Sequence, residues 1–379
     1  MDATATTRIP CAFQQMPDPR RNNSSHKLID ILTLALFAVI CGAEDWVAVA
    51  QYGQAKLNWL KTFLELPRGI PSHDTFSDVF AKLQPEAFER CFMEWMKKMV
   101  QLSGGKLVAI DGKSLRRSFE HGWDKSGMAH MVSAFVTANQ MVFAQVKTEG
   151  KGQERSAIER LLELQDLNGA VVTIDALGCQ KEIAQEILDA HGQYLLQVKD
   201  NQPALREKLQ AIFTEARLEN FKDLEHDYFT ETDGGHGRVE TRRVWVCWDP
   251  SLLGELAQQW PNLKSLVLVE RTREMDNGPA SVELSYYISS LDRRTRAKRL
   301  AGHIRGHWGV ENNLHWQLDV SFREDERRIR KGHGAENFSR LCRIALNLLK
   351  KEKTTKAGVA TKRKKCGWSN DYLLTVVAA

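Results

Sequence analysis

Residues 107–113 read LVAIDGK, a short apolar run that ends in Asp111 and a turn. Residues 171–174, VVTI, form a second run, which ends in Asp175. Four apolar residues followed by turn-forming residues are typical of a strand that is buried on both faces. Because the carboxyl ends of parallel strands lie at one edge of a sheet, we expect the two aspartates to converge there. Carboxylate oxygens at such an edge suit hard divalent cations.

The patterns around these two runs predict a mixed α/β core. A capping-box pattern at residues 156–159, SAIE, opens a helix, and further apolar stretches indicate strands. The expected order is β-β-β-α-β-α-β, with strands at 107–110, 131–137, 141–147, 171–174 and 194–198 and helices from 156 and over about 181–190. This order is the one expected of a ribonuclease-H-like fold, although composition alone also permits another mixed α/β fold.

Changes of pattern along the chain predict five segments. Apolar residues at helical spacing before the core indicate a helical domain, and strand-like runs after it indicate a β-rich insertion. We therefore expect an N-terminal arm and helical domain that binds DNA over 1–103, the first part of the core over 104–200, the β-rich insertion over 201–294, a C-terminal helical part of the core over 295–349 and a basic tail over 350–379.

A third acidic residue, Glu311, lies in the segment HIRGHWGVENNLHW over residues 303–316. Glu311 is seven residues, or about two turns, beyond Ile304, and so falls near the apolar stripe of its expected helix. That stripe comprises Ile304, Trp308, Leu314 and Leu318. A carboxylate in a buried stripe is costly unless it is paired or bound to a metal. A metal site is one interpretation, and a salt bridge to Arg305 or another arginine is the alternative.

The net charge of +5 is unevenly distributed. Residues 350–365 carry eight lysine or arginine side chains against one acid, Glu352, which gives +7 there and leaves about −2 for the remainder. Such a cluster is typical of a segment that binds a polyanion such as nucleic acid. A solvated terminus has a similar composition, so both interpretations stay open.

Cysteine usage favours a reducing compartment, and hydropathy argues against a membrane-spanning helix. The seven cysteines include no C-x-x-C pair, which argues against a zinc ribbon or a disulfide framework. The N-terminus lacks the basic start of a signal peptide. The most apolar stretch, 31–43, is shorter than the roughly 20 residues that a spanning helix needs. We therefore expect a cytoplasmic protein with no membrane partner.

Five stretches together resemble the DDE transposases of bacterial insertion sequences, most closely their H-repeat-associated group, over nearly the full length. They are VAIDGKS at 108–114, TIDA at 173–176, QVKDNQ at 197–202, HGRVETR at 236–242 and HWGVENNLHW at 307–316. The resemblance implies that Asp111, Asp175 and Glu311 form the catalytic, metal-binding triad. It also implies a ribonuclease-H-like core with a β-rich insertion before the glutamate helix.

The resemblance further implies an enzyme that binds the ends of its insertion sequence, cleaves there and joins those ends to target DNA. Two Mg²⁺ or Mn²⁺ ions about 3.5–4 Å apart would serve the phosphoryl transfer. The expected partner is double-stranded DNA, bound by a homodimer at the bacterial nucleoid. Two alternatives are a catalytically silent, transposase-derived DNA-binding protein and a metal-dependent nuclease without strand transfer.

Contacts to DNA are expected from basic and polar side chains near the triad, because most protein–DNA hydrogen bonds go to the backbone. The candidates are Lys113, Arg116, Arg117, Lys199, Asn201, Arg238 and Arg242. Related transposases carry a tyrosine, an arginine and a lysine around the glutamate, where this chain has Ile304, His307 and Leu318. We expect His307 to replace the arginine in part, although only its protonated form is charged.

Overall fold

The structure, a computed structural model, describes residues 13–20, 24–99, 106–119, 128–138, 140–148, 154–163, 167–235, 238–275 and 278–378. The chain forms two compact units. Unit 1 comprises Met1–Gln101, Gly112–Gln153 and Val310–Ala379, and unit 2 comprises Leu102–Asp111 and Glu154–Gly309. The expected boundary near 101–105, most of the N-terminal arm and the motif residues 236–237 lie outside the described residues.

Unit 2 is built on a mixed sheet with the strand order β1-β4-β5-β9-β8-β7-β6. Strand β1 pairs in parallel with β4, in register from Leu107 opposite Val171 to Ile110 opposite Ile174. Strand β4 pairs in parallel with β5, and the apolar residues of both are buried, as the sequence predicts. The bounds are β1 (Leu107–Ser114), α7 (Glu154–Glu163), β4 (Val171–Ile174), α8 (Lys181–Asp189) and β5 (Gln193–Val198).

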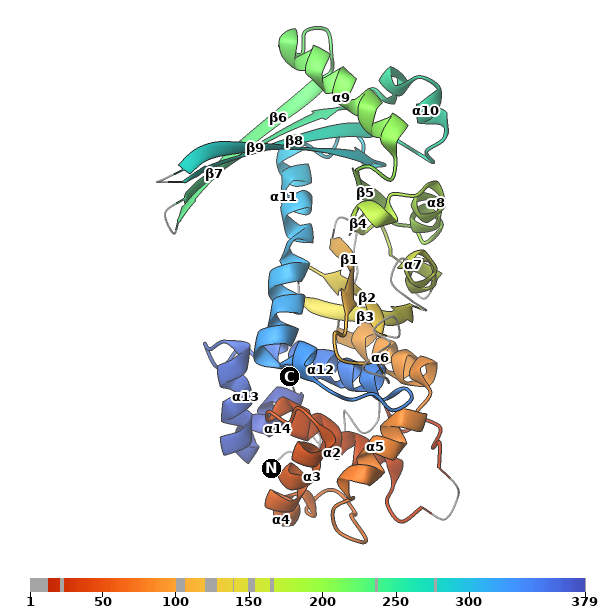
Figure 1. Cartoon of the computed structure of the whole chain (residues 1–379), viewed down its shortest axis with the longest axis vertical. Helices are drawn as coiled ribbons and strands as arrows, with labels where there is room; N and C mark the ends of the chain where they lie inside the picture. Colours follow the sequence, from red (N-terminus) through yellow and green to blue (C-terminus); the bar gives the residue numbers. More distant parts are fainter. Residues whose placement is uncertain are drawn as a thin grey trace. The chain divides into compact units, whose positions relative to one another are not determined.

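The β-rich segment continues this sheet, because β9 pairs antiparallel with β5 and the remaining strands follow it. Helices α9 and α11 cover opposite faces of these strands (Figure 1). The ring of Tyr286 packs against Phe213 of α9, whereas the next residue, Tyr287, packs in the core cluster that contains residues of α11. The bounds are α9 (Pro203–Leu218), β6 (His226–Gly235), β7 (Arg238–Cys247), η3 (Pro250–Leu253), α10 (Glu255–Gln258), β8 (Ser265–Met275), β9 (Gly278–Ser289) and α11 (Ala297–His307).

Unit 1 is mainly helical. Helix α2 is buried on almost all sides, and α12 packs against it. The predicted cap of α5 is confirmed, because Ser72 Oγ accepts the N–H of Thr75 at 3.2 Å. Strands β2 and β3 pair as the predicted hairpin. The bounds are α2 (Leu28–Ile40), α3 (Trp46–Ala55), α4 (Leu57–Leu60), α5 (His73–Lys82), α6 (Pro85–Met99), β2 (His130–Val136), β3 (Met141–Thr148), α12 (Gly334–Lys351), α13 (Val359–Trp368) and α14 (Asn370–Ala378). Among the described residues, none of the helices has the length and apolarity needed to cross a membrane.

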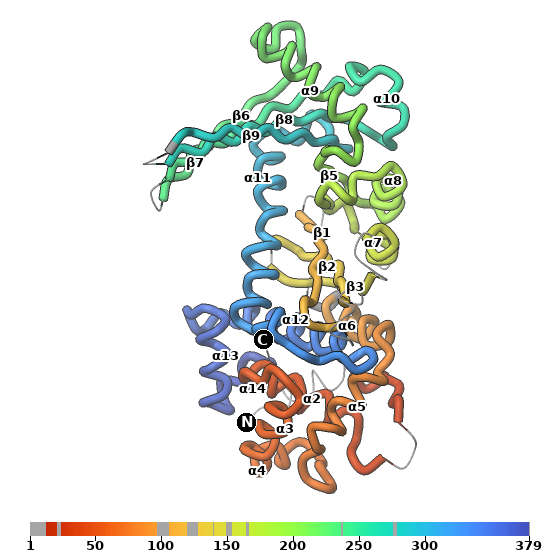
Figure 2. The backbone as a smooth tube through the Cα atoms, viewed as in Figure 1, coloured from red at the N-terminus to blue at the C-terminus, as the bar shows by residue number. Residues whose placement is uncertain are grey.

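The C-terminal basic segment, for which nucleic-acid binding and a solvated terminus were both open interpretations, is helical. It folds as α13 and α14, which lie beside the N-terminal helices of the same unit (Figure 2). Lys362 and Arg363 are only 5% and 4% exposed. Lys362 pairs with Glu352 at 3.0 Å, and Arg363 donates to the backbone oxygen of Val39 at 2.8 Å. Two side chains of the basic cluster, Lys362 and Arg363, therefore make buried contacts within the protein.

A second buried ion pair links the segment before α12 to α12 itself. Arg343 Nη1 lies 3.0 Å from Glu324 Oε1, and both side chains are almost completely buried. Replacement of Arg343 by methionine should lower the free energy of unfolding by about 3–5 kcal/mol, because Glu324 keeps a buried, unpaired charge. Urea unfolding measures this loss. Arg323→Met, at an exposed ion pair, serves as the control and should cost less than about 1 kcal/mol; similar losses in both variants would contradict the prediction.

Lys350, at the end of α12, is partly buried and has no carboxylate partner among the described residues. Its Nζ donates to the backbone oxygen of Asn313 at 2.6 Å and lies 5.6 Å from the centre of the Phe135 ring. Burial lowers the pKa of Lys350 to about 7, and the charge of Lys353 adds to this effect.

The titration of Lys350 should appear in the pH dependence of stability. Between the folded pKa of about 7 and an unfolded pKa near ~10.4, the unfolded chain binds the extra proton. The free energy of unfolding of the wild type, minus that of Lys350→Met, should therefore rise with pH across this window and stay flat below it. Urea unfolding of both proteins at several pH values measures the difference. If the free energies of unfolding of the two proteins run parallel across the pH range, the pKa of Lys350 is not lowered in the folded protein.

Candidate active site

The two aspartates lie at the ends of neighbouring strands of unit 2. Ile110 of β1 stands opposite Ile174 of β4 in the parallel register, so Asp111 and Asp175 follow at the same edge of the sheet. Both are partly buried. Burial raises the pKa of Asp175, and the nearby charge of Glu154 raises it further. The two strand ends that carry the aspartates therefore lie side by side, as the sequence predicts.

The backbone after β4 holds Asp175 in place. The Oδ1 atom of Asp175 accepts the N–H of Leu177 at 3.1 Å and caps the short helix η2 (Ala176–Gly178). A side chain at Gly178 would meet Ile174 Cγ2 at 2.2 Å, so only glycine fits this turn. Asn201 Nδ2 donates to the backbone oxygen of Ala176 at 2.6 Å. Asn201, expected as a DNA contact, is instead engaged in holding this turn.

Two further predicted DNA contacts lie beside the aspartates in unit 2. Lys199 is exposed, and its charge lowers the pKa of Asp175 against the stronger effect of burial. His307, at the end of α11, has its Nδ1 3.1 Å from the hydroxyl of Thr173 on β4. A hydrogen bond therefore fixes the imidazole of His307 against the strand that carries Asp175.

Glu311 lies in unit 1, on a helical segment that departs from α geometry. After α11 ends at His307, the chain forms two π-helical turns, η4 (Glu311–His315) and η5 (Gln317–Ser321). The expectation that Glu311 sits in a buried stripe is wrong: its side chain is 63% exposed. Trp308, which the sequence placed in the same stripe, is 49% exposed.

His315 is a site residue that the sequence did not assign to the active site. Its Nδ1 lies 3.2 Å from Glu311 Oε2, and the imidazole itself is buried. The hydrogen bond from His315 lowers the pKa of Glu311, and the charge of Lys113 acts in the same direction. The four-residue spacing between Glu311 and His315 was the signal that could have identified this pair.

Lys113, expected to contact DNA, is engaged within unit 1. Its Nζ lies 2.7 Å from both carboxylate oxygens of Asp319 and 3.5 Å from Asp325, and the side chain is 9% exposed. Arg116 also pairs with Asp325, at 3.0 Å, but is 77% exposed. Arg117 is exposed, and its backbone oxygen accepts Arg330 Nε at 3.3 Å. Arg116 and Arg117 can still reach DNA, whereas Lys113 cannot do so without breaking its pair.

The remaining two candidates for DNA contacts, Arg238 and Arg242, line a pocket of about 220 Å³ between strands β6–β9 and α11 in unit 2. Arg242 is held by Glu240, by Glu231 at 3.3 Å and by Asp233 at 3.6 Å. Arg238 is exposed and has no ion pair within the described part of the chain. The two arginines therefore differ in their freedom to bind a phosphate.

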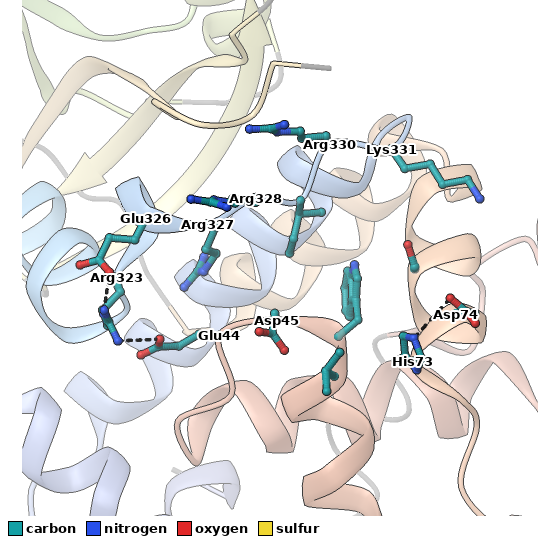
Figure 3. A pocket seen from close by; sticks show the side chains of 14 residues that line it. Glu44, Asp45, His73, Asp74, Arg323, Glu326, Arg327, Arg328, Arg330 and Lys331 are labelled. Atoms are coloured by element: carbon teal, nitrogen blue, oxygen red, sulfur yellow. Dashed lines mark hydrogen bonds and ion pairs between the residues drawn. The ribbon is translucent and has the colours of Figure 1, made fainter. Parts of the chain in front are cut away.

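A larger pocket, of about 580 Å³, lies within unit 1. Figure 3 shows basic side chains, including Arg328 and Arg330, along one wall, and acidic ones along the opposite wall. Arg323, at one side of this pocket, pairs with Glu44 at 3.4 Å and with Glu326. The mixture of charges offers no uniform surface for an anion, so we assign the pocket no role in catalysis.

Carboxylate oxygens are the ligands that Mg²⁺ and Mn²⁺ prefer. Unit 2 supplies two such groups, Asp111 and Asp175, and unit 1 supplies Glu311.

Two family models match consecutive parts of the chain. Residues 11–96 match the family model described as DDE_Tnp_1-associated, and residues 102–348 match the transposase DDE domain. "Putative transposase YncI" of Escherichia coli O157:H7 is 41% identical over 367 residues, which cover 96% of this chain and 93% of that protein. "H repeat-associated putative transposase YhhI" of E. coli K12 is 39% identical over 370 residues, 96% of each chain.

A solved piggyBac transposase synaptic complex with hairpin DNA aligns with a TM-score of 0.42 and 12% identity, over 98% of this chain and 76% of that one. So slight a likeness supports no argument about this fold. The family model, by contrast, spans the whole segment from before Asp111 to beyond Glu311. The chain belongs to the DDE transposase family, in its H-repeat-associated group.

Proposed function

We propose that this protein binds the terminal inverted repeats of its own insertion sequence, cleaves DNA there and joins the ends to target DNA. The observation that carries the proposal is the parallel, in-register pairing of β1 and β4, which places Asp111 and Asp175 at one edge. Membership of the DDE transposase family supports it independently. The element order and the parallel strands β1, β4 and β5 support a ribonuclease-H-like core.

In the proposed mechanism, Asp111, Asp175 and Glu311 hold two Mg²⁺ or Mn²⁺ ions. Bound there, such ions supply Lewis acidity and an activated nucleophile for attack on phosphorus. The protein contributes preorganisation: the N–H of Leu177 orients Asp175, and His315 orients Glu311. Substrate DNA then needs only to be positioned against these fixed carboxylates.

The proposed DNA contacts are the candidates that the protein leaves accessible. They are Arg116, Arg117, Lys199, Arg238 and His307. Lys113, Asn201 and Arg242 are each engaged by other groups of the protein, so we propose structural roles for them. We propose that the active form on double-stranded DNA is a homodimer, since cleavage and joining involve two element ends.

Replacement of any one of Asp111, Asp175 and Glu311 by alanine should abolish strand cleavage and leave binding of the element ends intact. The reason is that each side chain is a proposed metal ligand rather than a DNA anchor. The measurement is Mg²⁺-dependent cleavage and strand transfer on duplexes that carry the inverted repeats flanking the gene. A variant that cleaves at the wild-type rate would remove its residue from the site.

Glu326→Ala is the matched acidic control, because Glu326 is exposed and pairs with Arg323. Asp319 and Glu324 are unsuitable controls, since one pairs with Lys113 and the other is buried against Arg343. Wild-type protein that binds the ends without cleaving would favour the silent DNA-binding alternative. Cleavage without joining would favour a nuclease.

The two arginines of the unit 2 pocket should contribute differently to DNA binding. Arg238→Ala should reduce the slope of log K against log salt by about 0.9, the value for one lost phosphate contact. Arg242→Ala should change the slope less, because carboxylates already neutralise this guanidinium. Binding titrations at several salt concentrations measure both slopes. Equal changes in the two variants would count against the proposed distinction.

A further inference from the structure

The segment that carries Glu311, residues 311–321, departs from α geometry. Its two turns, η4 and η5, are π-helical, a geometry that is rare and is frequent at functional sites. In such a turn a backbone oxygen accepts from the residue five positions on, as Glu311 O does from the N–H of Trp316. A carbonyl oxygen has a second lone pair, so side chains from elsewhere in unit 1 can also donate to these turns.

Three cations from separate stretches of unit 1 contact this segment. Lys113 binds the carboxylate of Asp319 at 2.7 Å, and Arg363 donates to the backbone oxygen of Ser321. Lys350 donates to the backbone oxygen of Asn313 at 2.6 Å, within the same turn as Glu311 and His315. Of these three contacts, that of Lys350 with Asn313 is therefore the nearest in sequence to Glu311.

The contact of Lys350 has a cost in stability. The neighbours of its ammonium group are a neutral backbone oxygen and the ring of Phe135, and neither returns the full cost of partly burying a charge. An apolar side chain of similar length would fill the same space without this penalty. The ammonium group of Lys350 is thus better explained by the backbone oxygen that it holds than by the stability that it adds.

We propose that Lys350 is a positioning residue for Glu311, which sets the backbone of the η4 turn through the oxygen of Asn313. The inference rests on the proposed function, because it assumes that Glu311 binds metal. It also reassigns one lysine of the basic segment: a side chain whose ammonium is turned inward to Asn313 does not serve the DNA backbone. Residues that orient metal ligands typically change metal affinity or activity 10–100-fold when they are removed.

The test compares Lys350→Met and Lys350→Arg with the control Lys356→Met, which changes an exposed lysine of the same basic segment. The measurements are the Mg²⁺ and Mn²⁺ concentrations that give half-maximal cleavage, and the dissociation constant for duplex ends. Lys350→Met should raise the half-maximal metal concentration by about 10-fold or more and leave end binding unchanged. Lys350→Arg, which keeps a donor, should restore most of the wild-type metal requirement, and Lys356→Met should not alter it.

The outcomes separate this inference from the proposed function. Wild-type protein that fails to cleave with either metal contradicts the proposed function itself. Wild-type cleavage with an unchanged metal requirement in Lys350→Met overturns the positioning role alone. Loss of end binding with a smaller salt slope in Lys350→Met would also overturn it, in favour of a DNA contact. If the methionine variant does not fold, Lys350→Gln, whose shorter donor cannot reach the same oxygen undisturbed, should still raise the metal requirement, and a wild-type value overturns the proposal.

Discussion

The parallel pairing of β1 with β4 is the constraint on which the rest of the site depends. A shift of the register by one residue would move Asp175 away from Asp111 and turn the side chains of β4 to the opposite faces of the sheet. The apolar runs of both strands are buried on both faces, which holds them inside the sheet. The same burial that fixes the fold therefore also sets two carboxylates at one edge, where it raises the pKa of Asp175.

Net charge is a poor guide to where this protein meets DNA. The basic segment 350–365 carries an excess of seven positive charges. However, Lys350, Lys362 and Arg363 donate to backbone oxygens of the protein, and Lys362 also pairs with Glu352. Arg242 likewise lies among three carboxylates. Counting basic residues overstates the surface open to phosphates, because the structure uses many of them to satisfy buried acceptors.

Local sequence patterns were sufficient to predict those strands and helix caps that depend mainly on neighbouring residues in the chain. The buried strands, the hairpin and the Ser72 cap follow from apolar runs and side-chain capping, and all are present. Strand β6 was missed because its exposed and half-buried residues give no apolar signal. The π-helical turns around Glu311 and the folding of the basic segment were missed as well. Both depend on contacts with residues distant in the chain, such as Lys350 with Asn313, which no periodicity records.

The departure from the wider transposase signature has a structural reason. Ile304 is 8% exposed and belongs to the core of unit 2, and Leu318 is fully buried in unit 1. An arginine, lysine or tyrosine head group at either place would have to leave its own core to reach a phosphate. His307, between them in sequence, is tied to Thr173 on β4. Two of the three signature positions, Ile304 and Leu318, therefore serve packing in this chain, and only His307 is among the DNA contacts proposed above.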